Sequence, residues 1–494
     1  MILKTKIKRW SAGLHVAMLN VETAKELGLQ AQEMILIKTI SKHPKETTAI
    51  LDIIEDELKK DEILFTSEVV LKLKLKKNQK VDINLAPVPK SVDFIKKKLE
   101  GKKLSKKEIE QITVDIVNDR LSEAEIALFV AAMYKVGMST KETVYLINAI
   151  IKTGNRFSLN NKFVVDKHSI GGVAGNRTTP IVVSICAAAG LTFPKTSSRA
   201  ITSAAGTADV METIARVEFT IKELKEILKK TGAFIIFGGG MGLVPADSKI
   251  IKVEKALNID PKSQLIASIM SKKFAVGSKY ILIDIPYGKS AKIQTRKKAE
   301  TLKRELITLG RYFNKKIKPI ITDGSQPIGN GIGPALELMD IIKVLDPKVK
   351  GPIDLEKKSL FLAGNLFELA GRAKKGAGIA MAEKILYSGK AFEKFKEIVK
   401  AQHGSLRRIK YSKLKKDILS NKTGEIREID NRKMNNLAKI AGSPIDKSAG
   451  VYLYHHVGEK VKKGEKLVTI YSETKTRLNE AAKFFCDMVP IKIR

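Results

Sequence analysis

Two short segments of this chain bring together residue types that could hold a phosphate group. Residues 166–180 read Asp-Lys-His-Ser-Ile-Gly-Gly-Val-Ala-Gly-Asn-Arg-Thr-Thr-Pro, and residues 195–209 read Lys-Thr-Ser-Ser-Arg-Ala-Ile-Thr-Ser-Ala-Ala-Gly-Thr-Ala-Asp. Glycine lets backbone N–H groups approach a ligand, while hydroxyls and cations surround it, as in phosphate sites at helix starts. We therefore interpret the two segments as parts of one anion site.

The glycines of the first segment need a strand before them and a helix after them. The apolar run 163–165 is typical of a strand, and the run 180–189 is typical of a helix. The positive end of that helix would then face the ligand. A tight turn before a buried helix is the alternative interpretation. The spacing of Gly171, Gly172 and Gly175 fits neither the dinucleotide-binding fingerprint nor the P-loop.

Length and composition predict several domains and no membrane span. With 494 residues and 44% hydrophobic content, the chain can build roughly three cores. No apolar run reaches the roughly 18 residues of a membrane helix, and the first residues lack a signal-peptide core. The only cysteines, Cys186 and Cys486, lie far apart, so no disulfide framework or zinc site is predicted. We expect a cytoplasmic protein without a metal.

The strong positive charge keeps a second class of function open. The net charge is +37, from 90 Lys and Arg against 53 Asp and Glu, which would attract any polyanion. A basic nucleic-acid-binding or scaffold protein is therefore an alternative to an enzyme. Against it, the lysines are spread along the chain, and aromatic residues make up only 6%. We favour a solvated lysine surface and a small anionic substrate, without a specific nucleic acid partner.

The periodicity of apolar residues predicts an α/β multidomain fold. Residues 1–84 contain short β-type runs and somewhat resemble a double-psi barrel, and the prolines after Leu85 indicate a linker. Helical periodicity follows in 85–155, as in Ile109, Ile112 and Ile116. Strands and helices then alternate, which is typical of an α/β sheet. A small β-rich C-terminal domain is expected over 434–494.

Several ordered motifs together resemble the thymidine/pyrimidine-nucleoside phosphorylase family across about residues 85–494. The motifs that carry the resemblance are Gly-Met-Ser-Thr-Lys-Glu-Thr at 137–143, Lys-His-Ser-Ile-Gly-Gly at 167–172, Ser-Ser-Arg-Ala at 197–200, Ala-Gly-Thr at 205–207, Pro-Ala-Asp at 245–247 and Ala-Ser-Ile-Met-Ser-Lys-Lys at 267–273. The β-rich extension and the phrase 196–207 are similar to the archaeal branch, which cleaves nucleoside monophosphates to base and ribose 1,5-bisphosphate.

The resemblance implies a domain arrangement and a set of substrates. It implies an all-helical domain in two segments, 85–155 and 245–277, opposed across a substrate cleft to a large α/β domain built from 156–244 and 278–433. It implies AMP and inorganic phosphate as substrates, no cofactor, and a homodimer or larger homo-oligomer. CMP and UMP are further candidate substrates.

The resemblance also implies roles for individual residues. Phosphate would be bound by Lys167, Ser169, Ser197 and Thr207, with a further hydroxyl from Thr178 or Thr179. AMP would be bound by Gly172, Ser198, Arg199, Ala200, Ile201, Thr202, Ser203, Thr207, Ser268 and Lys292. Of these, the candidates for its 5′-phosphate are Ser198, Arg199, Thr202, Ser203 and Lys292. The proton donor to the leaving base would be Asp260.

Some of these assignments have plain structural alternatives. Asp260 before a proline is also an ordinary helix start. Ser268 and Lys272 share a helix face, which could point into the cleft or into solvent. The family's pyrimidine-contacting arginine would fall on Val253, which weakens the runner-up activity, thymidine or uridine phosphorolysis. A phosphoribosyltransferase of the anthranilate type has a related architecture, but no acidic pair suits its metal-bound diphosphate.

Overall fold

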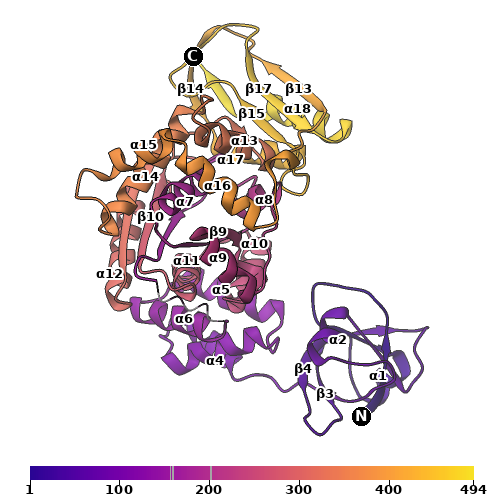
Figure 1. Cartoon of the computed structure of the whole chain (residues 1–494). Coiled ribbons are helices and arrows are strands. Elements are labelled where there is room, and N and C mark those ends of the chain that lie inside the picture. The colour runs from indigo at the N-terminus through magenta and orange to yellow at the C-terminus, as the bar shows by residue number, and fades with distance from the viewer. Residues whose placement is uncertain (156, 158, 160, 201–202) are drawn as a thin grey trace. The chain divides into compact units, whose positions relative to one another are not determined.

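The computed structural model describes residues 1–155, 157, 159, 161–200 and 203–494, which form two compact units (Figure 1). The first unit comprises residues 1–154 and 245–268, and the second comprises 155–244 and 269–494. Helix α11 (Lys262–Ala275) contributes residues to both. Within the described ranges, no helix is long and apolar enough to cross a membrane.

The N-terminal part is a closed barrel with the strand order β1-β5-β2-β4-β3-β6. Its strands are β1 (Ile2–Ile7), β2 (Val16–Asn20), β3 (Met34–Thr39), β4 (Glu46–Ile54), β5 (Glu62–Phe65) and β6 (Lys80–Leu85), with the short helices α1 (Val21–Glu26) and α2 (Ser67–Leu73). Alternate side chains, among them Leu19, Ile35 and Leu51, are buried inside, as closure of a sheet requires. The β-rich N-terminal part is thus confirmed, and the double-psi connection stays a prediction.

Three helices in the helical part of the first unit begin with serine caps. It contains α3 (Ser91–Leu99), α4 (Lys106–Val117), α5 (Glu123–Val136), α6 (Thr140–Lys152) and α10 (Pro245–Leu257). Ser105, Ser122 and Ser139 each cap a helix whose third residue is a glutamate that bonds back to the cap. Glu142, in the third capping box, is also buried and pairs with Lys98 at 2.8 Å. The motif at 137–143 therefore has a structural use.

Asp119 joins the barrel to the helices within the first unit. It follows α4 with a φ of 61°, and its carboxylate pairs with Lys72 of the barrel at 2.7 Å and with Lys249 of α10. Thr48 of β4 donates to its backbone carbonyl. The Lys249 amine also bonds the Ile116 carbonyl at 3.0 Å, near the end of α4. One residue thus holds two parts of the unit together.

The second unit is built on a parallel sheet whose strand order reverses between β7 and β10. Strands β7 (Val165–Ser169), β10 (Tyr280–Tyr287) and β11 (Lys316–Asp323) pair in parallel on one side. Strands β8 (Phe193–Ser197) and β9 (Ala233–Phe237) pair in parallel, and a Val164–Thr192 bridge joins them to β7. In such sheets ligands bind outside the carboxyl ends of the strands at the point of reversal. That point lies beyond Ser169.

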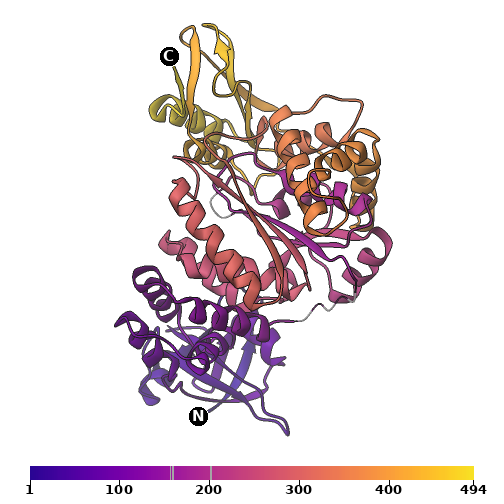
Figure 2. The same ribbon diagram turned by 90° about the vertical axis from the view of Figure 1, so that its left-hand side faces the viewer.

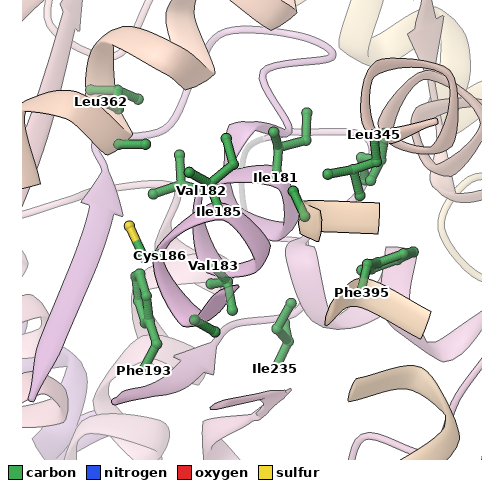
Figure 3. Packing of buried hydrophobic residues seen from close by; sticks show 14 of the residues in the cluster. Ile181, Val182, Val183, Ile185, Cys186, Phe193, Ile235, Leu345, Leu362 and Phe395 are labelled. Atoms are coloured by element: carbon green, nitrogen blue, oxygen red, sulfur yellow. The ribbon is translucent and has the colours of Figure 1, made fainter. Parts of the chain in front are cut away.

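Helices cover this sheet and bury its apolar strands. They are α7 (Thr178–Ala188), α8 (Thr207–Glu212), α9 (Ile221–Thr231), α12 (Arg296–Tyr312), α13 (Pro334–Leu345), α14 (Ile353–Leu369), α15 (Gly378–Tyr387) and α16 (Lys390–Ala401). Figure 2 shows α12 lying along the sheet. Helix α7 is buried over nearly its whole length, and Ile181, Val183 and Cys186 pack with Phe193 and Phe395 (Figure 3). This core fixes the start of α7, next to the predicted anion site.

The C-terminal part is a second β-rich layer backed by helices. Its elements are β12 (Gly331–Ile332), β13 (Leu414–Leu419), β14 (Gly424–Ile429), α17 (Asn431–Ala441), β15 (Gly450–Leu453), β16 (Lys460–Val461), β17 (Lys466–Ser472), α18 (Lys475–Met488) and β18 (Ile491–Ile493). Strand β13 pairs with β17, and β14 pairs with β18. The layer therefore draws three strands from before residue 434.

Candidate active site

Lys167 lies at the centre of the predicted phosphate site. The strand expected over 163–165 is observed at Val165–Ser169, so Lys167 is a strand residue and not part of a loop. Its side chain is fully buried, and its Nζ lies 2.6 Å from Thr178 Oγ1 and 3.4 Å from Thr179 Oγ1, at the start of α7. Burial lowers the pKa of Lys167 to about 7. An anion bound there would favour the charged amine.

Asp284, on the neighbouring strand β10, holds Ser169 in place. The two residues are direct partners in the β7–β10 register, and Ser169 Oγ donates to Asp284 Oδ2. Thr322 donates to the other carboxylate oxygen, and Lys358 Nζ of α14 lies 3.3 Å from Oδ2. Although burial alone would raise it, Lys358 and Lys167 hold the pKa of Asp284 below its ordinary value. The carboxylate is therefore ionised and accepts hydrogen bonds only.

Arg177 connects the glycine loop to Thr207. Its guanidinium donates to Thr207 Oγ1 at 3.1 Å and to the Ala205 carbonyl at 2.6 Å, and it pairs with buried Glu337 of α13 at 2.6 Å. Burial raises the pKa of Glu337. The two predicted segments therefore meet, as the anion-site hypothesis requires.

The loop after β8 is held in shape by one carboxylate. Asp209 Oδ2 accepts from the backbone N–H of Ala200 at 2.7 Å and of Gly206 at 2.8 Å. A Cβ on Gly206 would come within 2.4 Å of the Ser198 carbonyl oxygen, so only glycine fits there. Ser197 is buried, and its Oγ has no hydrogen-bond partner among the described residues. That hydroxyl is available to a ligand.

Ser198 and Ser203, two further predicted AMP ligands in this loop, differ in their surroundings. Ser198 is exposed, and Ser203 Oγ donates to the Ala205 carbonyl at 2.7 Å. Two predicted AMP ligands, Ile201 and Thr202, lie outside the described residues. The anion-binding role of these positions stays a prediction.

Arg199 is bound by carboxylates. Its guanidinium makes two bonds to Glu212, of 2.6 and 2.8 Å, approaches Glu218 at 3.2 Å, and lies over the Phe237 ring. Hydrogen bonding to Glu212 raises the pKa of Arg199 and lowers the pKa of Glu212 to about 2. A phosphate group would have to compete with these carboxylates for the same donors.

Gly172 and Lys292, two predicted AMP contacts, lie against each other. Gly172 has a φ of +100°, and a Cβ there would come within 2.4 Å of the Lys292 backbone nitrogen. Lys292 follows β10, so the glycine loop and the segment after β10 meet at the sheet's point of reversal. The sequence separates these residues by 120 positions, and the fold brings their backbones into contact.

The predicted residues of the first unit sit on and before α11. Asp260 is exposed and lies two residues before the first residue of α11. Ser268 is buried, and its Oγ donates to Asp247 Oδ2 at 3.1 Å, while Gln264 donates to Oδ1 at 3.0 Å. Asp247 thus organises this face. Val253 is buried and lines a cavity of about 240 Å³ with barrel residues such as His15.

A buried charge cluster lies beside Lys167. Asp166 pairs with Lys195 at 3.3 Å and with Lys273 at 3.0 Å, and all three side chains are buried. Burial lowers the pKa of Lys273 to about 7. Burial, with Lys273 and Lys195 nearby, holds the pKa of His168 well below its usual value, so this imidazole is neutral.

Sequence reasoning missed Asp284, Lys358 and Glu337. An aspartate inside the apolar strand 280–287 was a usable signal, because a buried carboxylate needs partners. Lys358 and Glu337 carried none, since they reach the site from distant helices. Among the described residues, no three His, Cys, Asp or Glu side chains gather as a metal site would require.

Comparison with known proteins identifies the family. Residues 92–154 match the helical bundle domain of the glycosyl transferase family, 161–392 match its a/b domain, and 425–492 match the pyrimidine nucleoside phosphorylase C-terminal domain. The chain is 43% identical to the AMP phosphorylase of Thermococcus kodakarensis, over 99% of this chain and 97% of that protein. Its identity to the AMP phosphorylase of Pyrococcus furiosus is 41%, over the same shares.

A solved structure supports the fold at greater distance. Anthranilate phosphoribosyltransferase from Thermus thermophilus aligns with a TM-score of 0.52 at 18% identity, covering 63% of this chain and 99% of that one. The identity of 41% and 43% to the two AMP phosphorylases, over 99% of this chain, decides which branch of the family it belongs to. This chain belongs to the AMP phosphorylase branch of the pyrimidine-nucleoside phosphorylase family.

Proposed function

We propose that this protein cleaves AMP with inorganic phosphate, giving adenine and ribose 1,5-bisphosphate. The observation that carries the proposal is the buried amine and hydroxyls at the sheet's point of reversal. Lys167, Ser197 and Thr207 present an amine and hydroxyls there, which are the groups a phosphate nucleophile needs on its non-attacking oxygens. The relatives named AMP phosphorylase indicate that the nucleotide is AMP.

The proposed chemistry is a displacement at C1′ of the ribose. A phosphate oxygen forms the new C1′–O bond while the C1′–N bond to adenine breaks, and its electron pair stays on the base. Asp260 donates a proton to a ring nitrogen, which makes adenine a better leaving group. The rest of the rate enhancement comes from positioning the phosphate against C1′ and from stabilising the charge that develops in the transition state.

We propose that the 5′-phosphate is held by the loop 198–203 with Lys292 and Gly172. Arg199 Nη1 and Nη2 are bound by Glu212 and Glu218, so the 5′-phosphate would share these donors with the two carboxylates. Ser268, oriented by Asp247, contacts the nucleoside. CMP and UMP are proposed as further substrates, and the protein is proposed to act as a homodimer or larger homo-oligomer.

Base release from AMP, CMP, UMP, adenosine and thymidine, each with and without phosphate, tests the proposal. AMP should be cleaved only when phosphate is supplied, with ribose 1,5-bisphosphate as product. Equal cleavage of adenosine would overturn the nucleotide assignment and favour a nucleoside phosphorylase. Absence of turnover with salt-sensitive polynucleotide binding would instead support the basic binding protein.

A further inference from the structure

The hydrogen-bond direction at Ser169 makes this residue an acceptor toward the ligand. A serine hydroxyl has one proton and two lone pairs. Its proton is donated to Asp284, which is an acceptor only. Asn176 Nδ2 donates to the same Oγ at 3.2 Å and occupies one lone pair. What Ser169 retains for a bound anion is therefore a lone pair and not a hydrogen.

Asp284 is held in this state from several sides. Thr322 donates to Oδ1 and Lys358 approaches Oδ2, while the strand register places Ser169 opposite. The Asp284 side chain is fully buried. For Ser169 to donate to a ligand, it would have to leave a buried carboxylate oxygen without that hydrogen bond, which is costly.

A second acceptor lies on the neighbouring side chain. Asn176 Oδ1 is buried, and it has no hydrogen-bond partner in the described part of the chain. A buried carbonyl oxygen without a donor is unfavourable unless a ligand supplies one. The site therefore presents Lys167 and Ser197 as donors, and Ser169 and Asn176 as acceptors.

We propose that Ser169, with its proton held by Asp284, accepts a hydrogen bond from the P–OH group of the incoming phosphate. The site then selects protonated tetrahedral oxyanions. Phosphate and arsenate carry such a hydroxyl at neutral pH, whereas sulfate presents unprotonated oxygens only. Asp284 and Lys358 are positioning residues in this scheme. The inference rests on the proposed phosphate site and adds its specificity.

Direct titration of the full-length protein with phosphate, arsenate and sulfate at neutral pH tests this specificity without AMP. Phosphate and arsenate should bind with similar affinity, and sulfate roughly 10- to 100-fold more weakly, the scale of one lost hydrogen bond beside charge. Equal affinity for sulfate and phosphate would overturn the proposal.

Two variants separate an acceptor from an ordinary donor. In Ser169→Ala, phosphate affinity should fall while sulfate affinity stays or rises, so that the preference collapses. In the control Ser197→Ala, which removes a donor, both anions should weaken by a similar factor. If Ser169→Ala weakens both anions equally, Ser169 donates to the ligand and the proposal fails. If the wild-type protein prefers phosphate to sulfate as expected but does not cleave AMP, the result would count against the proposed reaction alone.

Discussion

At the scale of single residues, burial decides what the charged groups of the phosphate site can do. Lys167 has no exposed surface, and its pKa falls to about 7, whereas a lysine in the unfolded chain titrates near 10.5. Between these values the unfolded chain binds more protons, so the contribution of Lys167 to stability rises with pH and is lowest below about 7. Bound phosphate offsets part of the free-energy cost of burying the Lys167 ammonium group, because the phosphate pairs with that charge.

We predict that Lys167→Met raises the KM for phosphate roughly 10- to 100-fold near pH 6.5, the range for a charge-assisted hydrogen bond. Near pH 9 the free enzyme's amine is already largely neutral, so the difference between variant and wild type should shrink. Measuring the KM for phosphate against pH for both proteins cancels the titration of phosphate itself. A difference that is constant across this range would show that Lys167 does not change charge there.

We predict that Asp260→Asn lowers turnover by about 10² while leaving AMP binding and thermal stability nearly unchanged. Asparagine has nearly the same shape as aspartate and still accepts hydrogen bonds, so this variant keeps any structural role and removes only the acidic proton. Single-turnover rates with saturating AMP and phosphate, together with the melting temperature, distinguish a catalytic role of Asp260 from a structural one. Wild-type turnover would leave Asp260 with a structural role alone.

At the scale of elements, two glycine positions show how a loop is fixed by its neighbours. Gly172 and Gly190 both have a positive φ, of +100° and +82°, but only Gly172 is packed against another backbone. We predict that Gly172→Ala raises the KM for AMP by about 10-fold or more, because it displaces Lys292. A Cβ at Gly190 would meet no atom of the described residues within 4 Å, so Gly190→Ala should lower stability only by the backbone strain of roughly 1 kcal/mol. Equal effects on the KM for AMP would contradict the packing argument.

The elements themselves were largely predictable, and the contacts across the site were not. The helix predicted over 180–189 is α7, and the apolar stripe of Ile109, Ile112 and Ile116 is the buried face of α4. The strand predicted over 163–165 ended too early and shares only Val165 with β7. Lys167 and Ser169 are polar, and their burial depends on partners from α7 and β10. Sequence gave no sign of the Glu212–Arg199 pair, because tertiary contact sets the direction of a long side chain.

At the scale of the whole molecule, the first unit depends on the joint at Asp119. We predict that Asp119→Asn, which tolerates the positive φ, loosens the barrel from the helices and lowers stability by roughly 1 kcal/mol, because the pairs are partly exposed. Limited proteolysis near residues 85–90 should be faster, with phosphate binding unchanged. The matched control is Glu123→Gln, which removes an exposed pair with Lys252 in the same unit. Unaltered proteolysis in Asp119→Asn would place the joint elsewhere.

The net charge of +37 acts on both substrates before either reaches its site. Field-assisted encounter is screened by salt, since the Debye length falls from about 30 Å at 0.01 M to about 3 Å at 1 M. We therefore predict that kcat/KM for AMP, at saturating phosphate, falls several-fold as KCl rises over that range. The weak cleavage expected for uncharged adenosine should change little, which makes adenosine the control for general salt effects. Parallel decline of both substrates would mean that salt acts on the protein, and that the lysine surface serves solvation alone.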